Sequence, residues 1–124
     1  MRRAGPLALV AAAACVQAAP PAPVAVGERV YQKCYACHSL EGPDPSTQGP
    51  SLRAIVGRAV AAEPGFAYSP AMRLYAVKQP RWTRESLDTF LADPQATAPG
   101  NEMGFFGVRD PEERHSLIEF LSRS

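Results

Sequence analysis

The sequence predicts an all-α fold in which short helices are joined by loops. No stretch of the chain alternates apolar and polar residues for long enough to form a half-buried strand. The 13 prolines among 124 residues divide the chain into short pieces. Two of these pieces, at Ser69-Pro70 and Asp110-Pro111, begin with a capping residue followed by proline, which is a typical helix start.

The first helix is predicted over residues 26–34. Val26 and Val30 lie one turn apart on one face of it, and Gly27 and Tyr31 are paired in the same way. Glycine inside a helix costs about 1 kcal/mol relative to alanine. Gly27 therefore indicates a place where a second helix crosses closely, although a position in a fraying first turn would also tolerate it.

Loops and capped helices alternate through the middle of the chain. A loop is expected over residues 39–49, and Ser51 is a possible cap for a short apolar turn at residues 52–56. The next helix is predicted to begin at Pro70, after the cap Ser69, and to run to about residue 77.

Two further helices complete the predicted fold. Thr83 caps the first of them, which ends at Asp93-Pro94 and has an apolar face formed by Leu87, Phe90 and Leu91. Asp110 caps the last helix, which runs to about residue 122. On this helix, Phe120 is the expected partner of Gly27 and Tyr31 in the first helix.

The segment Cys34-Tyr35-Ala36-Cys37-His38 indicates the chemistry of the protein. Two cysteines separated by two residues and followed by histidine form the attachment pattern of c-type haem. The thiols form thioether bonds with the two vinyl groups of the porphyrin, and the histidine then lies where its imidazole can bind the iron. This pattern predicts one covalent haem c per chain.

Two other interpretations use the same residues. A structural zinc site at Cys34, Cys37 and His38 would need a fourth ligand, for which the remaining candidates of the usual kinds are Cys15 and His115. A thioredoxin-like redox pair would need a strand–helix–strand context, and no such context is visible in the sequence.

The N-terminus has the layout of a secretory signal peptide. Arg2 and Arg3 precede an apolar run at residues 7–16, and cleavage is predicted after Ala18 or Ala19. The apolar run is short for a membrane span, which needs about 20 residues. An uncleaved anchor and a lipidated Cys15 are the alternatives. A signal peptide predicts the periplasm, the compartment in which c-type haem is attached.

Cleavage divides the chain into a signal peptide at residues 1–19, a Pro/Ala-rich lead-in at 20–25 and one domain at 26–124. The mature chain retains 11 Lys and Arg against 12 Asp and Glu, a net charge near −1. This balance does not favour nucleic-acid binding, which calls for a strongly basic face. Because the two remaining cysteines are assigned to haem, no disulfide is predicted.

Over residues 24–124 the chain resembles the class I cytochromes c of the mitochondrial and soluble bacterial type. The matching segments occur in the order found in that family: Gly27 with Tyr31, residues 34–38, Gly49-Pro50-Ser51-Leu52, Gly57-Arg58, residues 65–69, Trp82 and residues 99–105. The resemblance implies a fold of short helices and loops wrapped around one haem, with the N- and C-terminal helices crossing.

The resemblance also implies roles for individual residues. His38 would be the proximal iron ligand, and the Pro50 carbonyl would accept a hydrogen bond from its other ring nitrogen. Met103 would be the second axial ligand, with Met72 and His115 as its rivals. The haem propionates would receive hydrogen bonds from Arg58, Tyr68 and Trp82, since buried carboxylates need such donors.

Four residues at three places depart from the usual family pattern. Asn101-Glu102 stands where Thr-Lys is common before the methionine, Phe90 stands where many relatives have tyrosine, and Met72 replaces a polar residue. These changes bear on the reduction potential and on the surface that meets partners, but not on haem attachment.

The coordination implied by the resemblance favours an electron carrier over an enzyme, because His38 and Met103 leave the iron no open position. We expect a monomeric periplasmic single-electron carrier. Its donor would be a membrane cytochrome complex or a dehydrogenase, and its acceptor an oxidase, a reductase or a photosynthetic reaction centre. The alternatives are a small haem peroxidase or gas-binding protein, and a dedicated haem subunit of one redox enzyme that docks through Arg73, Lys78, Arg81 and Arg84.

Overall fold

The computed structural model describes residues 1, 5, 13–15 and 22–124 of the chain. Most of the predicted signal peptide therefore lies outside the described residues. The described part is all-α, as predicted, and its one β-type contact is an isolated bridge between Ala59 and Arg81. Its helices are α1 (Pro23–Tyr31), α2 (Pro70–Lys78), α3 (Arg84–Ala92), α4 (Pro94–Thr97) and α5 (Pro111–Leu121).

Helix α1 begins and ends three residues earlier than predicted. Pro23 occupies its first turn, a position where the missing N–H of proline is no loss. The last three residues of the predicted lead-in are therefore helical. Backbone turns continue the chain beyond Tyr31, with Cys34 N donating to the Tyr31 carbonyl at 2.7 Å and Cys37 N donating to the Cys34 carbonyl at 3.0 Å.

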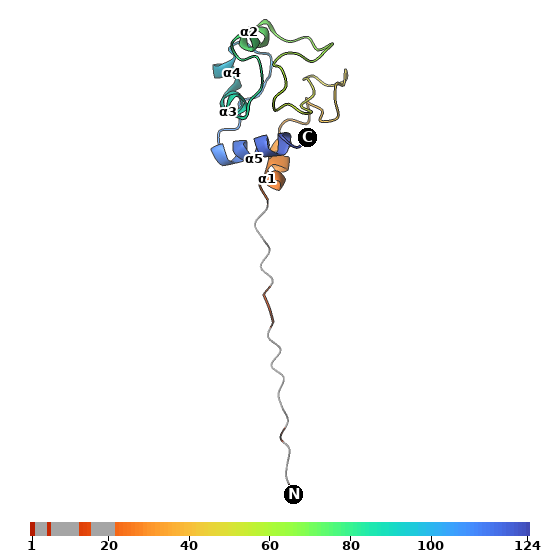
Figure 1. Ribbon diagram of the computed structural model, residues 1–124, viewed down its shortest axis with the longest axis vertical. Helices are drawn as coiled ribbons and strands as arrows, with labels where there is room; N and C mark the ends of the chain where they lie inside the picture. Colours follow the sequence, from red (N-terminus) through yellow and green to blue (C-terminus); the bar gives the residue numbers. More distant parts are fainter. Residues whose placement is uncertain (2–4, 6–12, 16–21) are drawn as a thin grey trace.

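The predicted crossing of the terminal helices is confirmed. Figure 1 shows α5 crossing α1 beside the C-terminus, while α5 also packs against α3. A Cβ atom added to Gly27 would collide with the Ser116 carbonyl and lie 2.7 Å from the Phe120 Cβ. The Tyr31 and Phe120 rings pack beside this point, with centroids 5.5 Å apart. Gly27 is thus the place where the two backbones approach each other.

The predicted caps of α2 and α3 are also confirmed. The Ser69 side chain accepts a hydrogen bond from Met72 N, while Thr83 and Ser86 form a reciprocal capping box. Helix α4 was not predicted, because Asp93-Pro94 suggested only a helix end. Proline cannot continue α3 but suits the first turn of a new helix, which the Asp93 side chain caps by accepting from Ala96 N.

Residues 52–56 form turns and not a helix. Ala54 adopts a φ of 50°, in the left-handed region, which interrupts any helical run. The Ala54 N–H instead donates to the Ser124 carbonyl at 3.0 Å. This bond ties the loop to the C-terminal end of the chain.

The loop around Arg58 is attached to the segment that precedes α3. Gly57 N donates to the Trp82 carbonyl at 2.6 Å, and Trp82 N donates to the Arg58 carbonyl at 2.9 Å. The buried Trp82 ring packs edge-on against Phe90 of α3, with centroids 5.1 Å apart. These contacts fix Arg58 and Trp82 relative to each other. Among the described residues, no helix is both long enough and apolar enough to cross a membrane.

Replacing Gly27 with alanine should lower the free energy of unfolding by about 1–3 kcal/mol, the usual cost of adding a methyl group to a packed contact. The added Cβ would push α1 away from Ser116 and Phe120. Denaturant titration would measure the loss. The control is Glu28→Ala at the exposed neighbouring position, which should change stability by less than about 0.5 kcal/mol. Equal stability of Gly27→Ala and the unmodified protein would contradict the close crossing.

Candidate functional site

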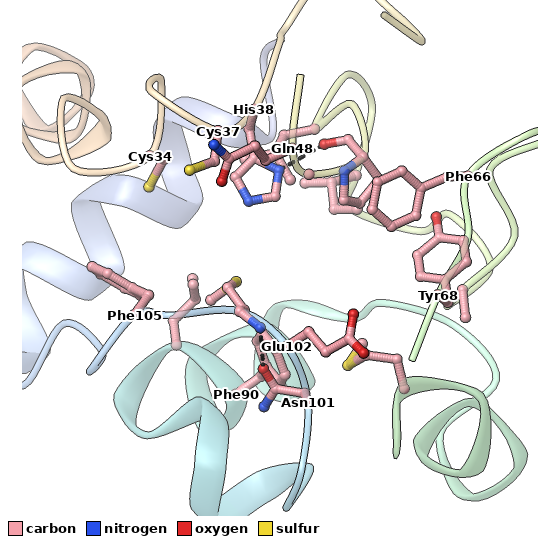
Figure 2. Close-up of a pocket in the computed structure, with 18 of the residues that line it drawn as sticks. Cys34, Cys37, His38, Gln48, Phe66, Tyr68, Phe90, Asn101, Glu102 and Phe105 are labelled. Atoms are coloured by element: carbon pink, nitrogen blue, oxygen red, sulfur yellow. Dashed lines mark hydrogen bonds between the residues drawn. The ribbon is translucent and has the colours of Figure 1, made fainter. Parts of the chain in front are cut away.

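A cavity of about 540 Å³ lies between the segment at residues 34–38 and the loop at residues 101–105. Its volume falls within the range of about 300–1,000 Å³ that is usual for cofactor sites. Figure 2 shows the Cys34, Cys37 and His38 side chains on one side of it and Asn101, Glu102 and Phe105 on the other. Much of the wall is apolar and comes from Leu52, Ile55, Leu87, Phe90, Leu91 and Leu117.

Cys34 and Cys37 both line the cavity and are not joined by a disulfide. Burial raises the pKa of the Cys34 thiol to about 11, with the neighbouring Cys37 adding to the effect. Redox-active cysteine pairs have a thiol pKa that is lowered instead. The environment of Cys34 is therefore unlike that of a thioredoxin-type pair.

The His38 ring extends into the cavity, as Figure 2 shows. Its Nδ1 atom lies 2.6 Å from the Pro50 carbonyl oxygen, which leaves Nε2 as the nitrogen available within the cavity. Burial lowers the pKa of His38, and a metal binds the neutral imidazole that this shift favours.

Gly49 packs closely against the ring of this histidine. A Cβ atom at Gly49 would lie 2.5 Å from His38 Cε1 and 2.7 Å from its Nδ1. Only a residue without a side chain allows the loop to lie flat against the ring. The sequence showed Gly49 as a loop residue within a family motif, but gave no reason for its contact with His38.

Met103 lines the cavity, and it belongs to the loop whose residues Glu102 and Phe105 lie opposite His38 in Figure 2. Its backbone N–H donates to the Asn101 side-chain oxygen at 2.9 Å. The Asn101 amide nitrogen in turn donates to the carbonyls of Pro94 and Ala98, each at 2.9 Å. Asn101 is 7% exposed. Its hydrogen bonds fasten the loop that contains Met103 to α4. Sequence reasoning noted Asn101 only as a departure from the family pattern.

The polar end of the cavity contains an unsatisfied donor. Arg58 donates from Nη1 to the Arg53 carbonyl at 2.9 Å and from Nη2 to the Ser51 carbonyl at 2.5 Å. Its Nε atom is buried without a hydrogen-bond partner among the described residues. A buried donor left unpaired costs about 1–3 kcal/mol, so an acceptor bound beside Arg58 would relieve a real penalty.

Tyr68 supplies a second donor at the same end. Its hydroxyl oxygen accepts from Glu63 N at 3.1 Å, which leaves the hydroxyl proton free for an acceptor. Burial raises the pKa of Tyr68, so the phenol keeps that proton. Trp82, which is buried, lines the cavity as well.

The rivals of Met103 are placed differently. Met72 also lines the cavity, whereas His115 is exposed on α5 and is not part of the wall. In the part of the chain that the structure describes, no group of three or more His, Cys, Asp and Glu side chains is arranged to hold a metal ion.

The basic strip considered as a docking surface is partly engaged within the fold. Arg84 pairs with Glu119 at 2.6 Å. Arg73 donates to the Tyr68 carbonyl at 2.6 Å, and Arg81 donates to the Gly57 carbonyl at 3.0 Å. Three of these four cations therefore make contacts within the fold: Arg84 links α3 to α5, and Arg73 and Arg81 bond to loop carbonyls.

These residues fit a haem c. The cavity offers paired thiols for the vinyl groups, and an imidazole and a thioether as iron ligands. It also offers an apolar wall for the macrocycle and unpaired donors for carboxylates. The structure brings together all eight residues predicted for the site: Cys34, Cys37, His38, Pro50, Arg58, Tyr68, Trp82 and Met103.

Comparisons with known proteins point to one family. The chain is 37% identical over 98 residues to cytochrome c2 of Agrobacterium tumefaciens, covering 79% of this chain and 88% of that protein. It is 38% identical over 107 residues to cytochrome c of Chlamydomonas reinhardtii, covering 86% of this chain and 93% of that protein. No family model matches the chain.

Solved structures give the same result. The fold is similar to that of cytochrome cH from Methylobacterium extorquens, with a TM-score of 0.72 and 31% identity, covering 82% of this chain and 98% of that one. The chain therefore belongs to the class I cytochrome c family, whose members are electron-transfer proteins that hold one covalently bound haem c.

Proposed function

We propose that this protein is a periplasmic single-electron carrier in which His38 and Met103 would bind the haem iron. The observation that carries the proposal is the placement of these two side chains on opposing segments around one cavity. When bound, haem c supplies an Fe(III)/Fe(II) couple that transfers one electron. The chain provides attachment, orientation and the electrostatic setting.

Cys34 and Cys37 retain the cofactor. Each thiol would hold the haem through a thioether bond to one of its vinyl groups. His38 is oriented by the Pro50 carbonyl, 2.6 Å from its Nδ1, and such a partner raises the basicity of a ligating imidazole. The neutral sulfur of Met103 acts in the opposite direction and favours a higher reduction potential.

Arg58, Tyr68 and Trp82 are proposed to receive the two propionates. The unpaired Arg58 Nε and the free Tyr68 hydroxyl proton support this role. A buried carboxylate is stable only when it is hydrogen-bonded. These three residues would therefore make burial of the propionate end favourable.

We further propose that the protein is exported by a cleaved signal peptide at residues 1–19 and acts as a monomer. The N-terminal sequence supports export, and the need to attach haem after export agrees with it. The partners would be redox proteins, with a membrane cytochrome complex or dehydrogenase as donor and an oxidase, reductase or reaction centre as acceptor.

Replacing Met103 with alanine should abolish the weak far-red absorption band that sulfur ligation gives to oxidised haem. The reduction potential should fall, because the ligand that favours Fe(II) is lost. Absorption spectra of the oxidised holoprotein and spectroelectrochemical titration would measure both effects.

The matched control is Met72→Ala, which removes the other methionine of the same cavity wall. The far-red band should survive this change. Loss of the band in Met72→Ala with retention in Met103→Ala would assign the ligand to Met72. A five-coordinate spectrum in the unmodified protein, together with carbon monoxide binding at neutral pH, would instead favour the gas-binding alternative.

Replacing Asn101 with alanine should loosen the ligand loop before the rest of the fold. The change removes three hydrogen bonds around a buried side chain and should cost about 1–3 kcal/mol. The far-red band should disappear at a lower temperature than the far-ultraviolet helix signal, which is the mark of local opening. Glu102→Ala, at the exposed next position, should leave the two transitions together. Coincident transitions in Asn101→Ala would contradict the proposed anchoring role.

A further inference from the structure

One peptide group connects His38 to an acidic side chain on a distant loop. The Pro50 carbonyl oxygen lies 2.6 Å from His38 Nδ1. The Ser51 N–H donates to the Glu63 carboxylate oxygen Oε1 at 2.9 Å. The C=O of Pro50 and the N–H of Ser51 belong to the same amide, whose atoms are coupled by resonance.

This arrangement allows the charge of the Glu63 carboxylate to polarise the amide that contacts His38. A carboxylate that accepts from the N–H stabilises the resonance form with negative charge on the amide oxygen. Hydrogen bonds linked in this way strengthen one another by an estimated ~10–30% per bond in condensed phases. The Pro50 oxygen thereby becomes a better acceptor for the Nδ1 proton of His38, and the imidazole gains electron density.

We propose that Glu63 is a positioning residue that tunes the haem iron through the Pro50–Ser51 peptide. The inference rests on the proposed role of His38 as an iron ligand. Metal-bound histidines often donate directly to a carboxylate or to a backbone carbonyl. Here the Pro50–Ser51 peptide lies between the two groups. Its C=O contacts the His38 ring, and its N–H donates to the Glu63 carboxylate.

Neighbouring residues hold the Pro50–Ser51 peptide and Glu63 in one geometry. Ser51 is 1% exposed, and its side-chain oxygen accepts from Arg53 N at 3.1 Å. Its own carbonyl, which belongs to the next peptide group, accepts from Arg58 Nη2 at 2.5 Å. Glu63 is fixed at its backbone as well, since its N–H donates to the Tyr68 hydroxyl at 3.1 Å.

The direction of the effect follows from the chemistry. An imidazole with more electron density stabilises Fe(III) more than Fe(II), so Glu63 lowers the reduction potential. The effect of Glu63 is opposite to that of Met103, which raises the reduction potential. Arg58 faces the same segment with a positive charge, but it bonds to the Ser51 carbonyl and not to the amide that touches His38.

The test compares Glu63→Gln with Glu41→Gln in the holoprotein. Glutamine at position 63 retains an acceptor oxygen but loses the charge, and charge-assisted hydrogen bonds are roughly twice as strong as neutral ones. Glu41 is exposed and lines the same surface groove as Glu63. Its substitution removes the same charge without touching the Pro50–Ser51 peptide.

In Glu63→Gln, the equilibrium between Fe(III) and Fe(II) should shift about threefold toward Fe(II), which corresponds to a rise of about 30 mV for a one-electron couple. The His38 Nδ1 proton and the Ser51 amide proton should both move upfield in NMR spectra of the reduced protein. Glu41→Gln should raise the potential by less and leave both protons in place.

Equal potentials in the two variants, with unchanged NMR positions and an intact far-red band, would overturn this inference while leaving the axial ligands as proposed. Absence of His38 ligation in the unmodified protein would overturn both. If Glu63→Gln does not accumulate, the unmodified protein decides the question through NMR coupling across the hydrogen bond between the Ser51 nitrogen and the Glu63 carboxyl carbon. Absence of that coupling would count against the proposed action of Glu63 on His38 through the Pro50–Ser51 peptide.

Discussion

The apolar residues of this protein pack around a cofactor-sized cavity, and this constraint governs the rest of the structure. Leu87 and Leu91 of α3, Leu117 of α5 and Ile55 of a loop all contribute to its wall. A small domain has little apolar surface to spare for a second core. The haem is therefore part of the hydrophobic core, and covalent attachment through Cys34 and Cys37 keeps that core complete.

The groups that meet the cofactor lie on loops, while the helices hold those loops in position. Gly49 and Pro50 seat the His38 ring from one side. On the other side, Asn101 fastens the Met103 loop to α4. The crossing of α1 and α5 at Gly27 closes the fold next to the segment that contains the cysteines. Rigid positioning of this kind suits a protein whose iron must change charge with little rearrangement.

Features that depend on local spacing were predictable from the sequence. The segment Cys34–His38 identified the cofactor because the two thiols and the imidazole must be close in the chain. The caps Ser69, Thr83 and Asp110 were recognised because a cap and its partners lie within one turn. The crossing at Gly27 was also predicted, since glycine in a helix needs a packing reason.

Features that depend on long-range contacts were not predictable in the same way. Gly49 and Glu63 look like ordinary loop residues, yet Gly49 lies against the His38 ring and Glu63 accepts a hydrogen bond from Ser51 N. Asn101 was missed for another reason, because its bonds to Pro94 and Ala98 depend on the unpredicted helix α4. The start of α1 at Pro23 and the extra helix α4 were missed because proline signals both ends and beginnings of helices.

The central claim is that Cys34 and Cys37 hold a haem within the cavity of an exported chain. The most direct test is the intact mass and absorption spectrum of the protein purified from a host that matures c-type haem. The account predicts a coloured protein that lacks its first 18 or 19 residues and is heavier than the remaining polypeptide by one haem, with the added mass on the peptide containing residues 34–38. A colourless protein with the mass of its amino acids alone would contradict it.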